Sequence, residues 1–414
     1  MVELTPLPDF RERVIVVGTS LRKPLVVLAP YFASLAAQEL PPRTRLHFCF
    51  VNDFAPDQKD AEALTTQWIA ERRGELLRGV PAGLNDFREG PATHEWTLAA
   101  MRRVGANKGK ILQRTLALKA DAVWLADADL IMDTTTLASL ISCERPIVSA
   151  VYWTHWSKQP QETVKSYAGP QVWLRHPYLL DGRGMDEAEF RAKLVTRELT
   201  RVWGFGACTL IARSVLEAGV DFSPAPDFPQ EGLWAGEDRQ FCIKCERLHI
   251  EAWADPWPDI FHIYHLEDDV PQIENMARRF CNRHPVRAGL GDLVALRLQA
   301  LEPIPVNNAQ WSHLPPQFAR GRLGQLPLMP EVEEAVYKLQ RGEKTIVRIH
   351  APLSHPAPFM RGHTRLIEVT LLDVKPFGAP PVVERELHIQ PHSGAHTDTF
   401  AQTDTQRALQ LEPA

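Results

Sequence analysis

The hydrophobic residues of this chain gather in short uninterrupted runs, several of which end abruptly in polar residues. The main runs are 24–29, 45–51, 122–126, 145–153 and 202–212. Continuous apolar runs of this length are typical of strands buried on both faces of a sheet. Helical patterns lie between or after them at Ser34–Leu40, Asp60–Arg78, Thr93–Lys119, Thr136–Ser142 and Gln240–Leu248. This alternation predicts an α/β fold with a mainly parallel sheet and helices on both faces.

Proline and glycine set the expected boundaries of these elements. Pro30 closes the first apolar run, so 24–29 is predicted to be the first strand, and Pro41-Pro42 stops the helix that follows it. In the long helix, Gly105 to Lys110 predicts a kink or a break. The second strand ends at Asn52-Asp53, and strands that end in polar residues before a helix are where α/β sheets hold ligands.

The strand at 122–126 carries the clearest chemical signal. It runs directly into Asp127 and Asp129, which are separated by one alanine and are expected to share a face. Two carboxylates at a strand tip make a hard-oxygen site that suits Mn²⁺ or Mg²⁺ bridging to a diphosphate. The alternative is a simple turn, in which Asp133 or the threonines after it cap the next helix.

A second group of candidate residues lies further along the chain. Gly204 and Gly206 open an apolar strand at a point where a backbone could approach a ligand closely. Glu237 and Asp238 precede a helix and suit general-base chemistry, although acidic residues there also stabilise the helix dipole. Lys108, in the expected helix break, could reach a phosphate or could lie on a solvated helix face.

Composition and charge narrow the class of protein. Hydrophobic residues make up 44% of the 414 and charged residues 23%, as in ordinary globular proteins. The net charge of −5 argues against a generally basic nucleic-acid surface. The six cysteines lie mostly in apolar runs, as expected of free buried thiols. No apolar stretch is long enough to cross a membrane, and the chain is expected to be cytoplasmic.

Four motifs in order carry a family resemblance. They are Asp127-Ala-Asp129, Gly204-Phe-Gly206-Ala-Cys-Thr-Leu-Ile, Gly236-Glu-Asp238-Arg-Gln-Phe and Phe261-His262-Ile-Tyr. Together they resemble glycosyltransferases of the GT-A fold, particularly bacterial family-2-like members and the related fungal mannosyltransferase group. The resemblance covers about residues 24 to 280. It implies a nucleotide-sugar donor, such as a UDP- or GDP-sugar, and a divalent metal, Mn²⁺ or Mg²⁺.

The resemblance also implies roles for individual residues. Asp127, Asp129 and His262 are the expected metal ligands, and His262 matches that place better than His265. Asp238 is the expected base of an inverting enzyme, with Glu237 beside it at the acceptor. The predicted donor-binding residues are Pro30, Asp53, Lys108, Asp127, Trp203, Gly204 and Gly206. Of the tryptophans, Trp203 and Trp234 are the first candidates for contact with a ligand.

The C-terminal part of the sequence has a different character. Gln325 to Ile349 and Leu366 to Val374 resemble the second half of FKBP-type peptidyl-prolyl isomerases: a short helix, a glycine turn and two strands. The first half of that domain has no match between Pro303 and Gly324. The expected organisation is a transferase domain at 1–300, a β-rich accessory module at 301–390 that could bind a partner, and a loosely ordered tail at 391–414.

The leading hypothesis is a metal-dependent glycosyltransferase of the hexosyltransferase type. Its acceptor would be a glycan, a protein, a small molecule or a modified nucleobase. The enzyme alternative is a nucleotidyltransferase on a similar sheet, but a Gly-rich basic signature is missing from Pro24 to Ser34. The other alternative is a degenerate transferase that serves as a binding or scaffold protein. The intact residues Asp127, Asp129, Asp238 and His262 argue against it.

Overall fold

The structure is a computed structural model, in which two compact units can be described. The described residues of the first unit end at Cys281, and the second unit extends from Asn282 to Pro380. The described residues of the first unit are 12–41, 43–81, 97–155, 168–174, 187–195, 197–228 and 236–281. Those of the second are 288, 292–301, 304–307, 310–312, 317–323, 326, 328, 330–350 and 364–375.

A nine-stranded sheet forms the centre of the first unit within the described residues. Its strands are β1 (Arg13–Gly18), β2 (Ser20–Leu21), β3 (Thr44–Asn52), β4 (Glu75–Arg78), β5 (Ala122–Ala126), β7 (Ile147–Ala150), β11 (Thr200–Val202), β13 (Cys208–Ala212) and β14 (Ala252–Asp255). Their order is β11-β14-β7-β13-β5-β1-β3-β2, and β4 also pairs with β3. Only β11 and β13 run antiparallel to their neighbours. The predicted α/β class with a mainly parallel sheet is therefore confirmed.

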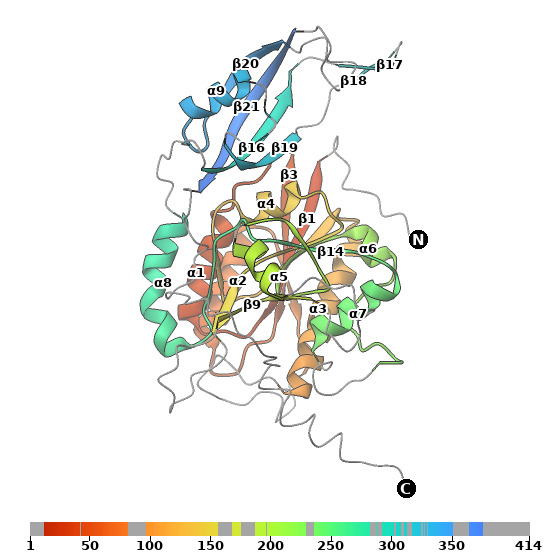
Figure 1. Cartoon of the computed structure of the whole chain (residues 1–414). Coiled ribbons are helices and arrows are strands. Elements are labelled where there is room, and N and C mark those ends of the chain that lie inside the picture. The colour runs from red at the N-terminus through yellow and green to blue at the C-terminus, as the bar shows by residue number, and fades with distance from the viewer. Residues whose placement is uncertain are drawn as a thin grey trace. The chain divides into compact units, whose positions relative to one another are not determined.

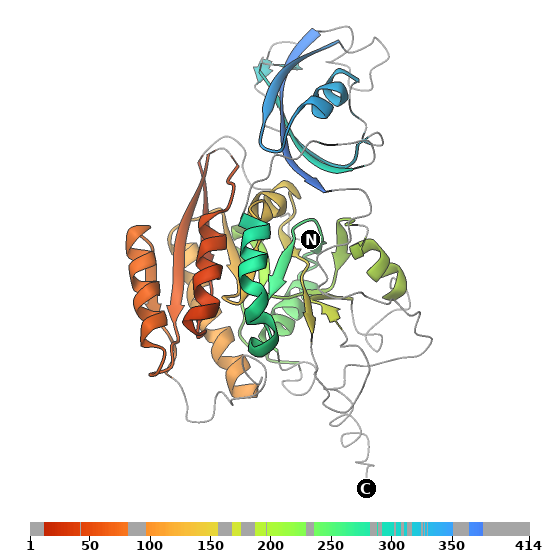
Figure 2. The ribbon, with the colours of Figure 1, turned by 90° about the vertical axis from the view of Figure 1, so that its left-hand side faces the viewer.

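Helices cover both faces of this sheet (Figure 1 and Figure 2). On one face, α1 (Leu25–Ala36), α2 (Lys59–Glu71) and α4 (Thr136–Ser142) share a core with Trp124 of β5. On the other, α3 (Leu98–Ala117), α5 (Glu187–Val195), α6 (Arg213–Glu217) and α7 (Glu237–Arg247) pack around Val123 and Leu125. Because successive strand residues point to opposite faces, the continuous apolar run of β5 supplies both cores.

The first predicted strand is wrong. Residues 24–29 fall in helix α1, which contains Pro30 in its interior, and the first strand of the sheet is β1. A run of six apolar residues suits a buried helix as well as a strand, so periodicity could not separate the two. Similarly, the helix predicted to Arg78 ends at Glu71, and the last four residues form the short strand β4.

The break predicted at Gly105 to Lys110 is also absent, because α3 is continuous there. Gly105 has a packing role instead. A Cβ on it would lie 3.0 Å from the Cβ of Glu237, at the start of α7. The glycine lets α3 and α7 approach each other closely, which positions the side chains described below.

Short antiparallel ribbons flank the carboxyl ends of the strands. Strand β6 (Leu130–Met132), which follows the acidic turn after β5, pairs with β15 (Ile260–His262) so that Leu130 and His262 are partners. Strand β8 (Trp153–His155) pairs with β9 (Ala168–Pro170), and β10 (Val172–Trp173) pairs with β12 (Gly204–Phe205). Helix α8 (Leu266–Cys281) follows β15 and packs beside α1.

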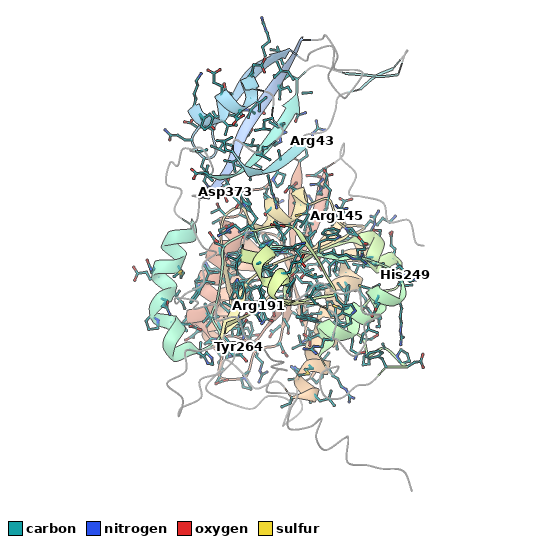
Figure 3. All side chains as sticks on the ribbon, viewed as in Figure 1. Arg43, Arg145, Arg191, His249, Tyr264 and Asp373 are labelled. Carbon is teal, nitrogen blue, oxygen red and sulfur yellow. The ribbon has the colours of Figure 1, made fainter. Side chains whose placement is uncertain are left out.

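The second unit has its own sheet and its own core. Its antiparallel strands are β16 (Leu293–Ala300), β19 (Gln317–Arg322), β20 (Lys344–His350) and β21 (Thr364–Lys375), in the order β19-β16-β21-β20, and a separate ribbon joins β17 (Ile304–Asn307) to β18 (Gln310–Ser312). Helix α9 (Pro330–Lys338) packs its Val332 and Val336 into this core. The predicted helix, glycine turn and two strands are confirmed, with Gly342 at a φ of +85°. Side chains fill the space between the elements of each unit (Figure 3).

In the described part of the chain, no helix is both long enough and apolar enough to cross a membrane.

Candidate functional site

Asp127 and Asp129 lie in a tight turn between β5 and β6. The backbone N–H of Asp127 donates to the carbonyl of Ala207 at 2.8 Å, so the turn is anchored to the start of β13. The Asp127 carboxylate accepts a hydrogen bond at 3.1 Å from the hydroxyl of Thr19, which follows β1. Because β1 and β5 are parallel, their carboxyl ends meet here, at the edge of the sheet where α/β proteins commonly hold ligands.

Asp129 is buried and lies among cationic or basic groups. Its Oδ2 is 2.6 Å from the ammonium of Lys23 and 3.6 Å from Nε2 of His262. The other ring nitrogen of His262, Nδ1, is hydrogen-bonded to the Thr154 hydroxyl at 2.8 Å, which fixes the ring orientation. The second carboxylate oxygen of Asp129, Oδ1, is buried without a hydrogen-bond partner among the described residues.

The two aspartates have opposite electrostatic environments. Burial raises the pKa of Asp127 to about 6, and the nearby charges of Asp129 and Asp238 add to this effect. Burial acts in the same direction on Asp129, but Lys23 and His262 outweigh it and hold the pKa of that carboxyl well below its usual range. Asp129 is therefore the permanently charged member of the pair, and Asp127 can take up a proton near neutrality.

These groups include the donor types of a metal site, but they are not drawn together around one point. Among the described residues, no three His, Cys, Asp or Glu side chains are gathered closely enough to hold a metal ion. Instead, the Lys23 ammonium supplies the positive charge next to Asp129. The predicted ligands Asp129 and His262 do converge, while the predicted contribution of Asp127 stays a prediction.

A second acidic group joins α3 to the start of α7. The buried ammonium of Lys108 contacts Glu237 Oε1 at 3.0 Å and Asp238 Oδ1 at 2.8 Å. The Glu237 side chain is 7% exposed and that of Asp238 is 23% exposed. Burial raises the pKa of Glu237 to about 7, with Lys108 opposing the rise. Asp127 also interacts electrostatically with Lys108 and Asp238, so the two acidic groups lie near each other.

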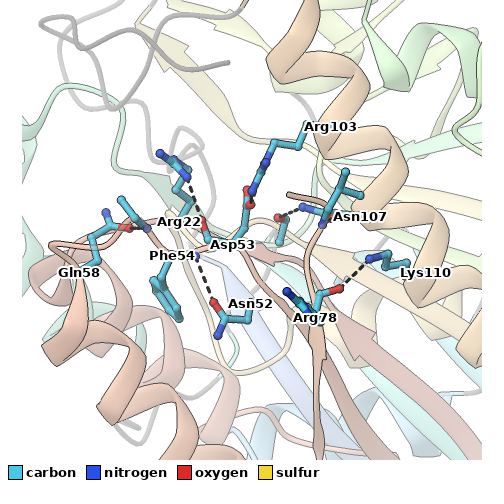
Figure 4. A network of polar contacts seen from close by, with 12 residues as sticks. Arg22, Asn52, Asp53, Phe54, Gln58, Arg78, Arg103, Asn107 and Lys110 are labelled. Carbon is cyan, nitrogen blue, oxygen red and sulfur yellow. Dashed lines mark hydrogen bonds and ion pairs between the residues drawn. The ribbon is translucent and has the colours of Figure 1, made fainter. Parts of the chain in front are cut away.

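A pocket of about 480 Å³ opens at the carboxyl ends of β3 and β4 (Figure 4). It is lined by Arg22, Asn52, Asp53, Phe54, Pro56, Leu76, Leu77, Arg78, Gly79, Val80, Pro81 and Arg103. Asp53, a predicted donor-binding residue, lies in this wall and is paired with the Arg103 guanidinium. Arg22 donates to the backbone carbonyl of Asp53 at 3.0 Å.

Two segments of the chain connect this pocket to the acidic site. Arg22 lines the pocket, and the next residue, Lys23, contacts Asp129. Likewise Arg103 lines the pocket, and Lys108, further along the same helix, contacts Asp238.

The predicted donor-binding glycines serve the packing of the site. A Cβ on Gly204 would lie 1.9 Å from the indole nitrogen of Trp173, so the missing side chain makes room for that ring. A Cβ on Gly206 would come within 3.1 Å of Gln171 and of the Tyr152 hydroxyl. Contact between a ligand and these glycines stays a prediction. The donor-binding role of Trp203 also stays a prediction, and its indole N–H donates to Glu246 at 3.0 Å.

The remaining sequence candidates are placed as follows. Pro30 lies inside α1 rather than at a strand tip, and its role in donor binding stays a prediction. Trp234 lies outside the described residues. Cys242 and Cys245 are free and buried in α7, and burial raises the pKa of both thiols.

Sequence reasoning missed several residues of this site, chiefly Thr19, Lys23, Arg103 and Thr154. Thr19 and Lys23 follow β1, and they were overlooked because that strand was not recognised. The apolar run Val14–Val17 followed by Gly18-Thr19 was the available signal. Thr154 carried no sequence signal, because its role depends on the approach of β15, which brings His262 from a distant part of the chain.

The chain was compared with known proteins in sequence and in structure. No protein-family model matches it, and no curated protein matches it in sequence. A solved structure of residues 1–349 of TarS from S. aureus has 12% identity and a TM-score of 0.35, covering 64% of each chain. The same protein in complex with UDP has 13% identity, with the same coverage and TM-score.

Two further structures match at similar or lower scores. The mannosyltransferase PcManGT from Pyrobaculum calidifontis, in complex with GDP-Man and Mn²⁺, has 13% identity and a TM-score of 0.35, covering 61% of this chain and 59% of its own. A peptidyl-prolyl cis-trans isomerase from Pseudomonas syringae has 15% identity and a TM-score of 0.17, covering 22% of this chain and 69% of its own. Likeness this weak carries no argument about function, so the proposal below is based on the site itself.

Proposed function

We propose that this protein is a glycosyltransferase that moves a sugar from a nucleoside-diphosphate sugar to an acceptor hydroxyl, with the help of a divalent metal. The observation that carries the proposal is the arrangement at the carboxyl ends of the parallel strands. There, a pocket lined by three arginines is joined to the Asp127–Asp129 turn, and that turn interacts with a second carboxylate group at α7.

The pocket has the properties expected for the nucleotide part of the donor. Its volume of about 480 Å³ lies within the range of ordinary ligand pockets. Phe54 and Leu76 supply apolar surface for a base, and Asn52 supplies an amide. Arginine side chains suit phosphate oxygens because the guanidinium presents several donors in one plane. The chain from Arg22 to Lys23 would lead the diphosphate toward Asp129.

Asp129 and His262 offer the oxygen and nitrogen donor atoms that a divalent cation such as Mn²⁺ can use. Oδ1 of Asp129 is buried and lacks a hydrogen-bond donor in the described structure, and His262 is held by Thr154 with Nε2 toward the same carboxylate. A histidine whose second nitrogen is fixed in this way is typical of metal sites. Asp127, Asp129 and His262 would hold the cation, which when bound would neutralise charge on the leaving diphosphate.

Asp238 is the proposed base for the acceptor hydroxyl. It is more exposed than Glu237, so an acceptor can reach it, and it begins a helix close to the acidic turn. One of its oxygens is held by Lys108, and the carboxylate can take the proton that the hydroxyl loses as the new glycosidic bond forms.

Donor binding tests the proposal directly. We expect UDP, GDP or one of their sugar conjugates to raise the melting temperature when Mn²⁺ is present. A ligand at 100 times its Kd stabilises a protein by about 2.7 kcal/mol. Asp129→Ala should abolish the metal-dependent part of this stabilisation and leave the folded state intact. Asp227→Ala, at an exposed aspartate, is the matched control and should behave like the native protein.

The screen also separates the alternatives. Release of nucleoside diphosphate from the donor indicates glycosyl transfer or donor hydrolysis, whereas release of pyrophosphate from a nucleoside triphosphate indicates a nucleotidyltransferase. If no nucleotide raises the melting temperature, with or without Mn²⁺, the proposed donor site is refuted.

A further inference from the structure

Lys108 is the most deeply buried cation at the junction between α3 and α7. Its side chain is 3% exposed, and its ammonium contacts two carboxylates that are neighbours in sequence, Glu237 and Asp238. A buried ammonium is expensive to desolvate unless it is paired, and here the two carboxylates offset that cost. Although burial acts in the opposite direction, these carboxylates raise the pKa of Lys108 well above its ordinary value, so it stays charged.

The surroundings of Lys108 fix its position. Gly105, one turn earlier on α3, lets the helix approach the Cβ of Glu237 closely. The Phe222 ring lies 5.1 Å from the ammonium, at a distance typical of a cation–π contact. The ammonium is thus enclosed by α7 and an aromatic ring, and among the described residues it donates hydrogen bonds to the two carboxylates.

We propose that Lys108 is a positioning residue for Asp238: it holds the first turn of α7 against α3 and keeps the Asp238 carboxylate aimed at the acceptor. This inference rests on the proposed function, and it gives Lys108 a different role from the direct phosphate contact expected from the sequence. Glu237, which is more buried and has a pKa raised to about 7, is the member of the pair that accommodates a proton.

The charges around the Lys108 ammonium determine the effect expected when that ammonium is removed. From α3, Lys108 is the cation, and Glu237 and Asp238 face it from α7. Asp127, in the turn after β5, adds negative charge that interacts with Lys108 and Asp238. Removing the ammonium takes the shared cation away from two neighbouring carboxylates, Glu237 and Asp238, so this pair should hold a proton up to a higher pH.

The experiment compares Lys108→Met with Lys108→Arg, and uses Arg102→Met, at an exposed position of the same helix, as the control. Two quantities are measured: the affinity for UDP and GDP with Mn²⁺ by calorimetry, and the pH dependence of donor turnover. We expect Lys108→Met to keep nucleotide affinity within about threefold. Its turnover near pH 7 should fall about tenfold or more and recover partly at higher pH. Lys108→Arg should restore part of the loss.

Two results would overturn the inference. A tenfold or larger loss of nucleotide affinity with an unchanged pH profile would make Lys108 a phosphate ligand, and no change in either quantity would make it a plain structural ion pair. If Lys108→Met fails to fold, Glu237→Met is compared with the double variant Lys108→Met/Glu237→Met, which removes the buried pair together. The double variant should then show the same shift in pH profile relative to Glu237→Met, and equal profiles would refute the positioning role.

Failure of the proposed function would appear differently, because the native protein itself would bind no nucleotide. The link between Lys108 and Glu237 can then still be measured by an NMR titration of the Glu237 carboxyl. Loss of Lys108 should raise the pKa of Glu237 further, since the ammonium now opposes the effect of burial. An unchanged Glu237 titration would contradict the electrostatic link itself.

Discussion

At the scale of single residues, the site separates carboxylates that stay charged from carboxylates that can hold a proton. Lys23 keeps Asp129 ionised, whereas burial raises the pKa of Asp127 and of Glu237 toward neutrality. Carboxyl groups whose pKa values are moved apart in this way are common where acid–base chemistry takes place. Structural ion pairs produce similar pKa shifts. Mutations that change charge but keep shape are therefore the informative ones here.

Asp238→Asn tests the proposed base. Asn keeps an oxygen that can accept the hydrogen bond from Lys108, so the first turn of α7 should stay in place. Nucleotide affinity should remain within about threefold, a difference of about 0.7 kcal/mol. Sugar transfer should fall by about 10² or more, the usual scale for losing a general base. Native transfer rates in the Asn variant would mean that the base lies elsewhere or that the enzyme retains configuration.

Glu237 should make the protein less stable as the pH rises toward neutrality. Its folded-state pKa is raised from 4.5 to about 7, so its contribution to stability is fully present below about pH 4.5 and is lost as the pH rises through 7. Glu237→Gln should remove this slope, which amounts to about 1 to 3 kcal/mol between the two ends. Denaturant unfolding of both proteins at pH 4.5, 5.5 and 7 measures it, and parallel curves would show that Glu237 is not perturbed.

At the scale of elements, the sequence predicted secondary structure best where the hydrophobic pattern was compatible with only one kind of element. The run 122–126 was correctly predicted as a strand because both of its faces are buried, and the functional role of the two aspartates at its polar end stays a prediction. The start of the chain was harder to read. The apolar run 24–29 is followed by Pro30 and so resembles a strand that the proline closes, but helix α1 continues through Pro30, and the first strand of the sheet is β1.

The contacts that complete the site could not be predicted because they join segments far apart in sequence. His262 reaches Asp129 through the pairing of β15 with β6, and Lys108 reaches Asp238 through the close approach of α3 to α7. Nothing in the local pattern around Lys108 distinguishes an inward-facing lysine from a solvated one. The four motifs in order nevertheless pointed to Asp129 and His262, whose Oδ2 and Nε2 atoms lie 3.6 Å apart, and to Asp238, whose role stays a prediction.

Two glycines offer a matched test of how the elements pack. At the end of β1, a Cβ on Gly18 would lie 2.3 Å from the backbone carbonyl of Cys49 and 2.8 Å from Ile111. Gly18→Ala must therefore move β3 or α3, and we expect a loss of about 1 to 3 kcal/mol in the free energy of unfolding. Gly109, in α3, has open space around its Cβ position, and Gly109→Ala should add about 0.5 to 1 kcal/mol.

Denaturant unfolding of the two alanine variants measures both effects on the same scale. Because Gly18 lies next to Thr19, which donates to Asp127, the first variant should also weaken nucleotide binding. Equal stability of the two variants would contradict the tight packing at the end of β1.

At the scale of the whole molecule, the chain consists of two units with separate cores. The apolar residues of the second unit, among them Val294, Leu296 and Val336, form a cluster of their own. The proposed site, by contrast, is built entirely from residues of the first unit. This organisation implies that donor binding and the role of the C-terminal unit can be separated by cutting the chain.

The position of the cut decides the result. Strand β16 lies between β19 and β21, so a chain that ends at Asn307 keeps β16 but loses both of its partners. Val294 and Leu296 would then be exposed on an unpaired strand, and such a chain is expected to aggregate. A chain that ends at Cys281 removes the whole second sheet and should stay monomeric and folded.

We expect the chain ending at Cys281 to retain the stabilisation by nucleotide and Mn²⁺ shown by the full-length protein, because every residue proposed to hold the donor precedes that cut. Thermal unfolding with and without ligand, together with light scattering, measures binding and aggregation for both truncations. The second unit would then act in the recognition of an acceptor or partner, so transfer to the acceptor should fall while donor hydrolysis continues. If the folded shorter chain no longer binds nucleotide, residues beyond Cys281 contribute to the donor site, and the two functions cannot be separated in this way.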